Sequence, residues 1–318
     1  MSTSLAMSSF GAESTTDDVL GGVDLAGTRV LVTGASAGLG LETTRALAAH
    51  GASVTMAVRD LAKGTTAMET VLATVPAADL ELRPVDLADL ASVRTFSDGF
   101  LADHDRLDVL IANAGIMACP QGTTADGFEL QLGTNHLGHF LLITRLMPAL
   151  VEADGARVVL LSSAGHRFAD VDLEDPGFEH QPYDPWVAYG RAKTANVLCA
   201  VGIDQRFRER GVRAFAVHPG GIQTELGRHL TDESLKFLMD RLAAAPTETV
   251  WKTVPQGAAT SVYAATSPDL EGRGGVYLED CHIAEVTDDP DAREGVRAYA
   301  LDPTAADALW TLSERLVG

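Results

Sequence analysis

Short apolar runs alternate along the chain with longer segments whose apolar positions recur at helical spacing. The short runs are rich in β-branched residues and bounded by glycine or polar positions, which predicts β-strands, and the longer segments predict amphipathic helices. The predicted strands are residues 29–33, 53–58, 80–85, 109–112, 157–161, 212–217 and 275–278. The predicted helices are residues 39–50, 61–75, 90–101, 128–151, 187–210 and 305–316, with Asp89 as an N-cap and Gly51 as a C-terminal stop.

This strict alternation predicts parallel strands joined by right-handed crossovers. The strands are mostly apolar throughout, which is typical of a sheet that helices cover on both faces. The expected fold class is therefore α/β, with a Rossmann-type doubly wound and mostly parallel seven-stranded sheet. A ligand should bind in the crevice beyond the carboxyl ends of the strands.

The segments outside this alternation complete the domain organisation. Residues 1–24 are rich in Ser, Thr, Gly and acidic residues and are expected to form a flexible tail, with a short helical turn near residues 17–20. Residues 25–318 are expected to form one domain, because no repeat or low-complexity linker interrupts them. Residues 221–254 are apolar on one side and are interpreted either as a lid over a lipophilic substrate or as an amphipathic helix packed on its own domain. Residues 280–318 form a C-terminal extension beyond the motifs.

Composition narrows the possible partners. The chain has 318 residues, of which 46% are hydrophobic, and a formal net charge of −20. Such a charge repels phosphate backbones and anionic lipid, so no nucleic-acid partner is expected. The N-terminus has no basic region before an apolar run, and no stretch approaches the ~20 apolar residues of a membrane span. We therefore expect a cytoplasmic protein without a membrane anchor.

Neither the cysteines nor the histidines predict a metal site. The three cysteines, Cys119, Cys199 and Cys281, are odd in number and widely spaced, which fits neither a disulfide framework nor a zinc motif. His136 and His139 are three residues apart on a predicted helix, but no third ligand pattern lies nearby. Buried, hydrogen-bonded histidines are the favoured interpretation, and no metal is expected.

A glycine-rich turn joins the first strand to the first helix. Residues 33–40 read T-G-x-x-x-G-x-G. Glycines let a backbone approach a pyrophosphate, and the following helix directs its N-terminal N–H groups toward it. Glycines also mark plain tight turns, but this position favours the binding of a dinucleotide. The expected contacts are Gly34, Ser36, Gly38, Leu39 and Gly40.

The end of the second strand bears on the choice of cofactor. An acidic residue there accepts hydrogen bonds from the adenosine ribose and favours NAD, whereas a basic residue pairs with a 2′-phosphate and favours NADP. Arg59 comes first after the strand and is followed by Asp60. NADP(H) is therefore the preferred cofactor, and NAD(H) stays possible because Asp60 competes for the ribose.

Tyr189 and Lys193 lie at positions i and i+4 of the long predicted helix after the fifth strand, so they share one helix face. A lysine ammonium one turn away favours the phenolate and lets a tyrosine act as an acid or base near neutral pH. Ser163, the second residue of a Ser-Ser pair at the end of the fifth strand, offers a hydroxyl for a substrate oxygen. The alternatives are a solvated helix surface and a serine pair that caps the next turn.

Further motifs follow the other strands: Asp86-Leu87, Asn113-Ala114-Gly115, Asn135, Pro219-Gly220 and Thr224. With the glycine turn, Ser163, Tyr189 and Lys193, they resemble the short-chain dehydrogenase/reductase family over residues 27–224. Residues 135–140 and 162–166, together with Arg59, resemble its retinol-dehydrogenase-like and WW-domain-oxidoreductase-like branch, which tends to use NADP(H) and lipophilic substrates. Ala112 departs from the family, which often has Asn there, and no WW domain precedes the catalytic domain.

The resemblance implies a role for each matched residue. Tyr189 would donate or accept the proton, Lys193 would lower its pKa and bind the nicotinamide ribose, and Ser163 would orient the substrate oxygen. Asn135 would hold a water that extends a proton relay from Lys193. The cofactor site implied by the resemblance also includes Asp86 at the adenine, Asn113 in the adenosine half and Thr224 at the nicotinamide, with Leu87, Ala114, Gly115, Pro219 and Gly220. The family also implies a homodimer or homotetramer.

The leading functional interpretation is an NAD(P)-dependent, NADP(H)-preferring oxidoreductase that interconverts an alcohol and a carbonyl on a lipophilic small molecule, with Tyr189 as general acid/base. One alternative is a cofactor-sensing regulatory protein on the same fold. Another is an epimerase or dehydratase, which also uses a Tyr/Lys pair. Net turnover of NADP(H) would separate that alternative from the oxidoreductase.

Overall fold

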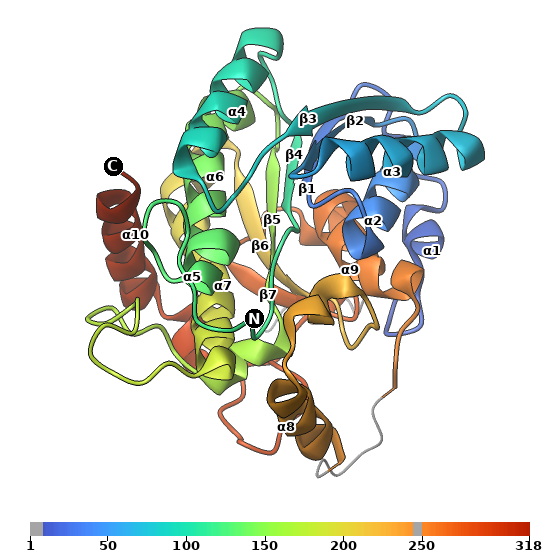
Figure 1. Cartoon of the computed structure of the whole chain (residues 1–318). Coiled ribbons are helices and arrows are strands. Elements are labelled where there is room, and N and C mark those ends of the chain that lie inside the picture. Colours follow the sequence, from blue (N-terminus) through green and yellow to red (C-terminus); the bar gives the residue numbers. More distant parts are fainter. Residues whose placement is uncertain (1–8, 244–249) are drawn as a thin grey trace, which may run out of the picture.

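The computed structural model describes residues 9–243 and 250–318. Its centre is a sheet with the strand order β3-β2-β1-β4-β5-β6-β7-β8 (Figure 1). The strands are β1 (Arg29–Thr33), β2 (Ser53–Val58), β3 (Asp79–Pro84), β4 (Val109–Ala112), β5 (Arg157–Leu161), β6 (Arg213–His218), β7 (Val276–Glu279) and β8 (His282–Ile283). The first seven are parallel, as predicted, and an eighth, antiparallel strand is added by a tight turn after β7.

Helices cover both faces of the sheet, because alternate residues of each strand point to opposite sides. Leu31 and Leu110 pack into one core with α4 (Leu90–Asp103), α6 (Gly138–Val151), α7 (Pro185–Phe207) and α10 (Pro303–Val317). Val30 and Ile111 pack into a second core with α1 (Thr16–Leu20), α2 (Gly38–Ala49), α3 (Leu61–Thr74) and α9 (Val254–Thr266). Figure 1 shows these helix layers on either side of the strands. The α/β doubly wound fold predicted from the sequence is confirmed.

Aspartates fix where several helices begin. Asp60, Asp89, Asp184 and Asp302 precede α3, α4, α7 and α10, and each accepts hydrogen bonds from two backbone N–H groups of the first turn. Such caps satisfy donors that otherwise have no partner within the helix. Helix α2 differs, because Ala37 precedes it and supplies no side-chain cap.

The N-terminal segment corrects one prediction. Residues 9–24 are not a flexible tail: α1 packs against α2 and α9, and Val19 and Leu20 are buried. The Thr16 hydroxyl donates to Glu42 on α2. The polar composition of the segment hid these few apolar residues, which are enough to dock one helical turn. Residues 1–8, the rest of the predicted tail, lie outside the described residues.

The predicted helix over residues 128–151 is divided into three parts. Helix α5 (Leu130–Leu132) leads into a π-helical turn (Gly133–Leu137), and α6 begins at Gly138. A Cβ at Gly138 would lie 2.2 Å from the carbonyl oxygen of Leu87, so a side chain cannot fit there. Apolar periodicity predicted the helix, but it does not report such close backbone contacts.

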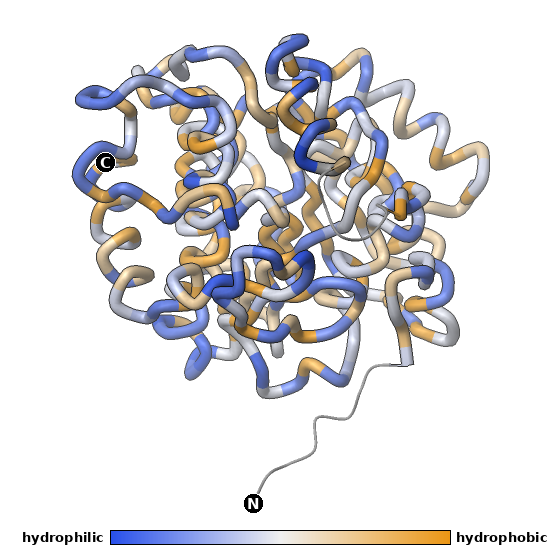
Figure 2. The backbone as a smooth tube through the Cα atoms, turned by 90° about the horizontal axis from the view of Figure 1, so that it is seen from below, coloured by the Kyte–Doolittle hydropathy of each residue, from blue (hydrophilic) through white to orange (hydrophobic). Residues whose placement is uncertain are grey.

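The remaining helical elements are short or lie near the surface. Helix α8 (Asp232–Ala243) lies in the predicted lid, of which residues 244–249 are outside the described part. The 3₁₀ turns are Ala164–Phe168, Arg208–Arg210, Glu225–His229, Pro268–Leu270 and Ala298–Leu301. Figure 2 shows hydrophilic positions interspersed with hydrophobic ones along the outer helices. None of the helices in residues 9–243 and 250–318 has the length and apolar character needed to cross a membrane.

Candidate active site

We call the glycine turn after β1 (residues 34–40) the glycine cradle; it is the predicted site for phosphate. Gly34 and Gly38 have φ of +66° and +54°, which L side chains rarely adopt. A Cβ at Gly40 would lie 2.4 Å from the carbonyl oxygen of Gly34. The first turn of α2 has no side-chain cap, so its N–H groups face the cradle without a competing carboxylate. These features fit a dinucleotide pyrophosphate.

Thr33 connects this turn by hydrogen bonds to the loop after β4. Its hydroxyl accepts the N–H groups of Asn113 and Ala114, both at 3.0 Å, and the Asn113 amide donates to the carbonyl of Thr33 at 2.8 Å. A Cβ at Gly34 would lie 2.9 Å from the Cα of Ala114. The two predicted cofactor loops therefore lie against each other at the carboxyl ends of β1 and β4.

His139 extends this network to the π-helical turn. Its Nε2 lies 2.8 Å from the Thr33 hydroxyl, and its Nδ1 lies 3.0 Å from the carbonyl oxygen of Asn135. Because the Thr33 hydroxyl already accepts two N–H groups, its proton is donated to Nε2, which leaves Nδ1–H to donate to Asn135. Burial lowers the pKa of His139 to about 4, which agrees with a neutral ring. His139 thus joins the cofactor turn to the segment that carries Asn135.

Asn135 is held by the backbone of Ile116. Its side chain accepts the Ile116 N–H and donates to the Ile116 carbonyl, both at 2.9 Å. A Cβ at Gly115 would lie 3.2 Å from Asn135 Oδ1 and 3.6 Å from Lys193 Nζ, so the three residues meet at one point. The water that Asn135 is expected to hold stays a prediction.

Ser163, Tyr189 and Lys193 come together where β5 ends and α7 begins. Tyr189 and Lys193 are 3% and 4% exposed. Lys193 Nζ donates to the carbonyl of Leu161 at 2.9 Å and lies 5.6 Å from the centre of the Tyr189 ring. The Ser163 hydroxyl accepts the N–H of Gly165 at 3.0 Å, so it does cap the next turn, and a hydrogen bond from the same side chain to the Tyr189 phenol lowers the pKa of Tyr189.

Burial shifts the pKa values of Tyr189 and Lys193. Burial raises the pKa of Tyr189 to about 12, against a smaller lowering by the Ser163 side chain, and burial lowers the pKa of Lys193 to about 8. Lys193 is not among the causes of this shift in the pKa of Tyr189, so the lowering expected from Lys193 stays a prediction.

Two glycines that the sequence analysis passed over bring this site together. A Cβ at Gly165 would lie 2.6 Å from Cε1 of Tyr189, and a Cβ at Gly190 would lie 2.9 Å from Cβ of Phe168. Helix α7 and the 3₁₀ turn Ala164–Phe168 can approach this closely only because both positions lack side chains. The phrase Ser-Ser-Ala-Gly-His was the available signal for Gly165, but its packing partner is far along the chain.

The two candidates for the adenosine ribose have different surroundings. Arg59 and Asp60 are both exposed, but the Asp60 carboxylate accepts the N–H groups of Ala62 and Lys63 as the N-cap of α3. Arg59 caps no helix. Burial lowers the pKa of His229 in the 3₁₀ turn Glu225–His229, and the charges of Arg228 and Arg59 lower it further.

The other predicted cofactor residues lie beyond the carboxyl ends of the strands as well. The Asp86 carboxylate accepts the N–H of Ala88 at 2.9 Å. Across the crevice, the Thr224 side chain lies 3.6 Å from a Cβ placed at Gly38. Gly220 has a φ of +93°. Ser36, Leu87 and Pro219 belong to the loops that follow β1, β3 and β6, and Leu39 lies in the first turn of α2.

An aromatic cluster of Phe168, Trp186 and Phe237 lies beside Tyr189. The Trp186 ring is 5.5 Å from Phe168, 5.7 Å from Phe237 on α8, and 6.3 Å from Tyr189, between ring centres. Helix α8 therefore packs on its own domain through Phe237, and the interpretation of residues 221–254 as a lid over a substrate stays a prediction. Its residues Leu235, Phe237 and Met239 are still about half exposed, at 47%, 44% and 54%.

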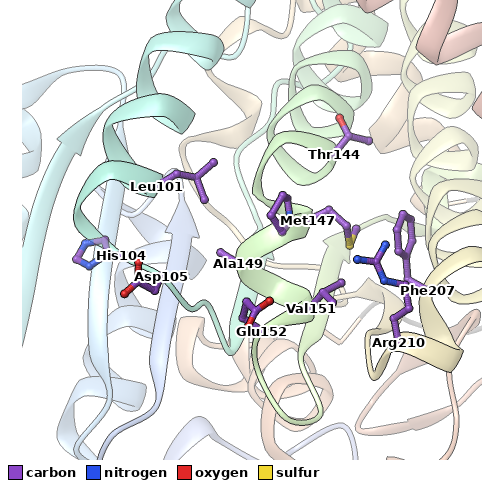
Figure 3. A pocket seen from close by; sticks show the side chains of 11 residues that line it. Leu101, His104, Asp105, Thr144, Met147, Ala149, Val151, Glu152, Phe207 and Arg210 are labelled. Atoms are coloured by element: carbon purple, nitrogen blue, oxygen red, sulfur yellow. The ribbon is translucent and has the colours of Figure 1, made fainter.

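A separate hollow of about 630 Å³ lies at the opposite end of the helices (Figure 3). It lies between the C-terminal parts of α4 and α6 and includes Leu101, His104, Met147 and Phe207. None of the predicted site residues lines it. Among the residues that the structure describes, no group of three or more His, Cys, Asp or Glu side chains could hold a metal ion.

Residues 28–235 match the family model described as short chain dehydrogenase. The chain belongs to the short-chain dehydrogenase family. It is 46% identical over 292 residues to a probable oxidoreductase of Streptomyces lividans, covering 91% of this chain and 97% of the relative. It is 40% identical to human retinol dehydrogenase 12, covering 93% of this chain and 88% of the relative. A crystal structure of an uncharacterized protein from Mycobacterium paratuberculosis is similar at a TM-score of 0.72 and 36% identity, covering 96% of this chain and 97% of that one.

Membership makes this short-chain dehydrogenase an enzyme, an oxidoreductase of a family that binds NAD(P). Its relatives also confirm the resemblance to the retinol-dehydrogenase-like branch. The family match ends at residue 235, so the C-terminal extension is not part of it.

Proposed function

We propose that this enzyme reduces a carbonyl, or oxidises the corresponding alcohol, on a lipophilic small molecule with NADP(H). The observation that carries the proposal is the meeting of Ser163, Tyr189 and Lys193 beside the glycine cradle at the carboxyl ends of β1, β4 and β5. Those ends of a doubly wound sheet are where ligands bind.

The preference for NADP(H) rests on Arg59. Asp60 is engaged as the N-cap of α3, whereas the Arg59 guanidinium is exposed beside the crevice and can pair with a 2′-phosphate. NADPH, when bound, supplies the hydride for the carbonyl carbon.

Tyr189 acts as the acid in the direction of reduction. Its pKa of about 12 keeps the phenol protonated at neutral pH, so it can give its proton to the substrate oxygen. The Ser163 hydroxyl donates a second hydrogen bond to that oxygen as negative charge develops on it. In the direction of oxidation Tyr189 must accept a proton, so that direction should require a higher pH.

A lipophilic substrate is supported by the aromatic cluster and by the apolar residues of α8. Phe168, Trp186 and Phe237 surround the approach to Tyr189, and Leu230 and Leu238 pack against Trp186 and Tyr189. The similarity to proteins named retinol dehydrogenase points to the same class of substrate.

The test is a turnover assay with lipophilic aldehydes, ketones and quinones, in which loss of reduced nicotinamide absorbance is followed with NADPH and with NADH. Faster turnover with NADPH is expected. Tyr189→Phe should lower kcat by about 10²–10⁴-fold, the usual contribution of a general acid, while NADPH binding is kept. Undiminished turnover in Tyr189→Phe would contradict the assigned role, and faster turnover with NADH would contradict the role of Arg59.

A further inference from the structure

The C-terminal extension reaches the catalytic serine. We define residues 285–301 as the C-terminal strap, which lies beyond the family match. Its backbone folds on itself, since the N–H of Val296 donates to the carbonyl of Glu285 at 2.8 Å. The N–H of Gly295 donates to Oε1 of Glu279 on β7 at 2.6 Å. The strap is therefore attached to the same edge of the sheet as the site.

His166 connects the strap to Ser163. The imidazole is fully buried, its Nδ1 lies 2.7 Å from the carbonyl oxygen of Ser163, and its Nε2 lies 3.2 Å from the backbone N–H of Arg297. A backbone N–H can only donate, so Nε2 accepts, and the single proton of the neutral ring is on Nδ1. The contact with the strap thus fixes the tautomer in which His166 donates to Ser163.

Neighbouring groups hold the same turn against the strap. The carbonyl of His166 accepts the Tyr299 hydroxyl at 2.6 Å. The Arg167 guanidinium donates to the carbonyls of Ala292 at 2.9 Å and Gly295 at 2.7 Å. Two residues of this turn, His166 and Arg167, are therefore hydrogen-bonded to a segment more than a hundred residues away.

The turn that His166 holds also sets the geometry of the catalytic groups. Ser163 begins it, and Gly165 within it donates to the Ser163 hydroxyl and packs on the Tyr189 ring. A shift of this turn would move the hydroxyl away from the phenol, and a small misplacement of reacting groups is costly in rate.

We propose that His166 is a positioning residue for Ser163 and that the C-terminal strap completes the active site by fixing its tautomer. This inference rests on the proposed role of Ser163. It assigns to the extension a function in the reaction in addition to its packing.

The backbone of Arg297 offers a matched pair of variants. Its φ of −71° is one that proline adopts, so Arg297→Pro removes the N–H that His166 accepts and points the ring Cδ at Nε2 instead, which breaks the contact between the strap and His166. Arg297→Ala is the reference, because both variants lose the side-chain hydrogen bonds to the carbonyls of Thr287 and Asp289 but only alanine keeps the N–H. We expect kcat of Arg297→Pro to be about tenfold below that of Arg297→Ala, with an unchanged KM for NADPH.

A second pair tests the histidine itself. His166→Asn places an amide donor near Nδ1 and can still bond to Ser163, whereas His166→Gln places its polar end near Nε2 and loses that bond. We expect kcat to fall in the order wild type, His166→Asn, His166→Gln. Equal kcat in the two variants, or in the two Arg297 variants, would overturn the inference.

Ser163→Ala separates the inference from the proposed function. If Ser163→Ala is inactive while Arg297→Pro matches Arg297→Ala, only the inference fails. If Ser163→Ala turns over as fast as the wild type, the proposed role of Ser163 fails, and the inference fails with it.

Discussion

The polar atoms of the proposed catalytic side chains are held largely by backbone groups. Lys193 Nζ donates to the carbonyl of Leu161, and the Ser163 hydroxyl accepts the N–H of Gly165. Ser162 completes the arrangement, since its hydroxyl donates to the carbonyl of Lys193 at 2.9 Å. The site is thus fixed to the end of β5 before a ligand enters, as pre-organised donors for a developing charge must be.

Arg59 and Asp60 are adjacent, but their substitutions should have different effects. A change at Arg59 should affect the choice of cofactor, and a change at Asp60 should affect the stability of α3. Arg59→Ala should raise the KM for NADPH about tenfold or more, because a charge-assisted contact to phosphate is lost, and should leave the KM for NADH unchanged. Asp60→Ala is the control, since it removes the cap of α3 without touching the 2′-phosphate. Steady-state kinetics with both cofactors checks this, and a parallel rise for NADH would count against the assignment.

Site residues could be predicted from the sequence where the type of residue and its spacing from other residues are enough to suggest a role. The Tyr189 and Lys193 pair, Ser163 and the glycine turn meet in the structure as the sequence indicates. His166 was passed over, and His139 was taken only as a buried histidine, because their roles depend on partners that spacing does not report. Arg297, which fixes the tautomer of His166, lies 131 residues further along the chain.

At the scale of elements, strands were predicted best. β1, β2, β4 and β5 have the predicted bounds, because a buried strand in a parallel sheet is a continuous apolar run between polar residues. The π-helical turn Gly133–Leu137 was missed, since its apolar positions still fit a helix. The two-residue strand β8 is too short to carry a pattern, and it follows a turn in which Asp280 and Cys281 have positive φ.

Helix α8 offers a test of the substrate entrance. Phe237 contacts Trp186 and Phe168, so Phe237→Ala should raise the KM for a lipophilic substrate about tenfold through loss of aromatic contacts, without changing the KM for NADPH. Leu235 is on the same helix, is exposed and lies outside the aromatic cluster, which makes Leu235→Ala the control. Equal effects of the two substitutions on the substrate KM would contradict a specific role for the cluster.

At the scale of the whole molecule, networks of hydrogen-bonded polar side chains lie next to the two hydrophobic cores at the carboxyl ends of the strands. Three buried histidines and the partly buried His218 belong to these networks, and burial lowers their pKa values: His136 to about 3, His139 to about 4, His166 to about 4 and His218 to about 3. His136 bonds to Ser313 on α10 at 2.8 Å, so the C-terminal helix is included. The fold therefore depends on neutral imidazoles.

Because the folded protein requires these imidazoles to be neutral, we expect its stability to fall in acid. Unfolded histidines bind protons below about pH 6.5, while the folded ones stay neutral, so the unfolded state takes up more protons and the free energy of unfolding falls as the pH drops toward 4. Each histidine should cost about 3 kcal/mol by pH 4. Denaturant unfolding at pH 7.5, 6 and 5 measures how steeply the free energy of unfolding depends on pH. The variant His136→Gln should have a shallower dependence, because one fewer histidine takes up a proton on unfolding. A free energy of unfolding that does not change over this range would contradict the prediction.

The predicted homodimer or homotetramer also belongs to this scale and stays a prediction, which the mass of the purified protein in solution would test. Neither state alters the central claim, which concerns hydride and proton transfer within one chain.

The most direct test of that claim follows the hydride. NADPH carrying deuterium at the transferred position of C4 is mixed with the enzyme and the best carbonyl substrate, and the alcohol is analysed by mass spectrometry. One deuterium bound to carbon in the product is expected, and little product from Tyr189→Phe although it still binds NADPH. A product without deuterium, or product formed equally fast by Tyr189→Phe, would contradict the account.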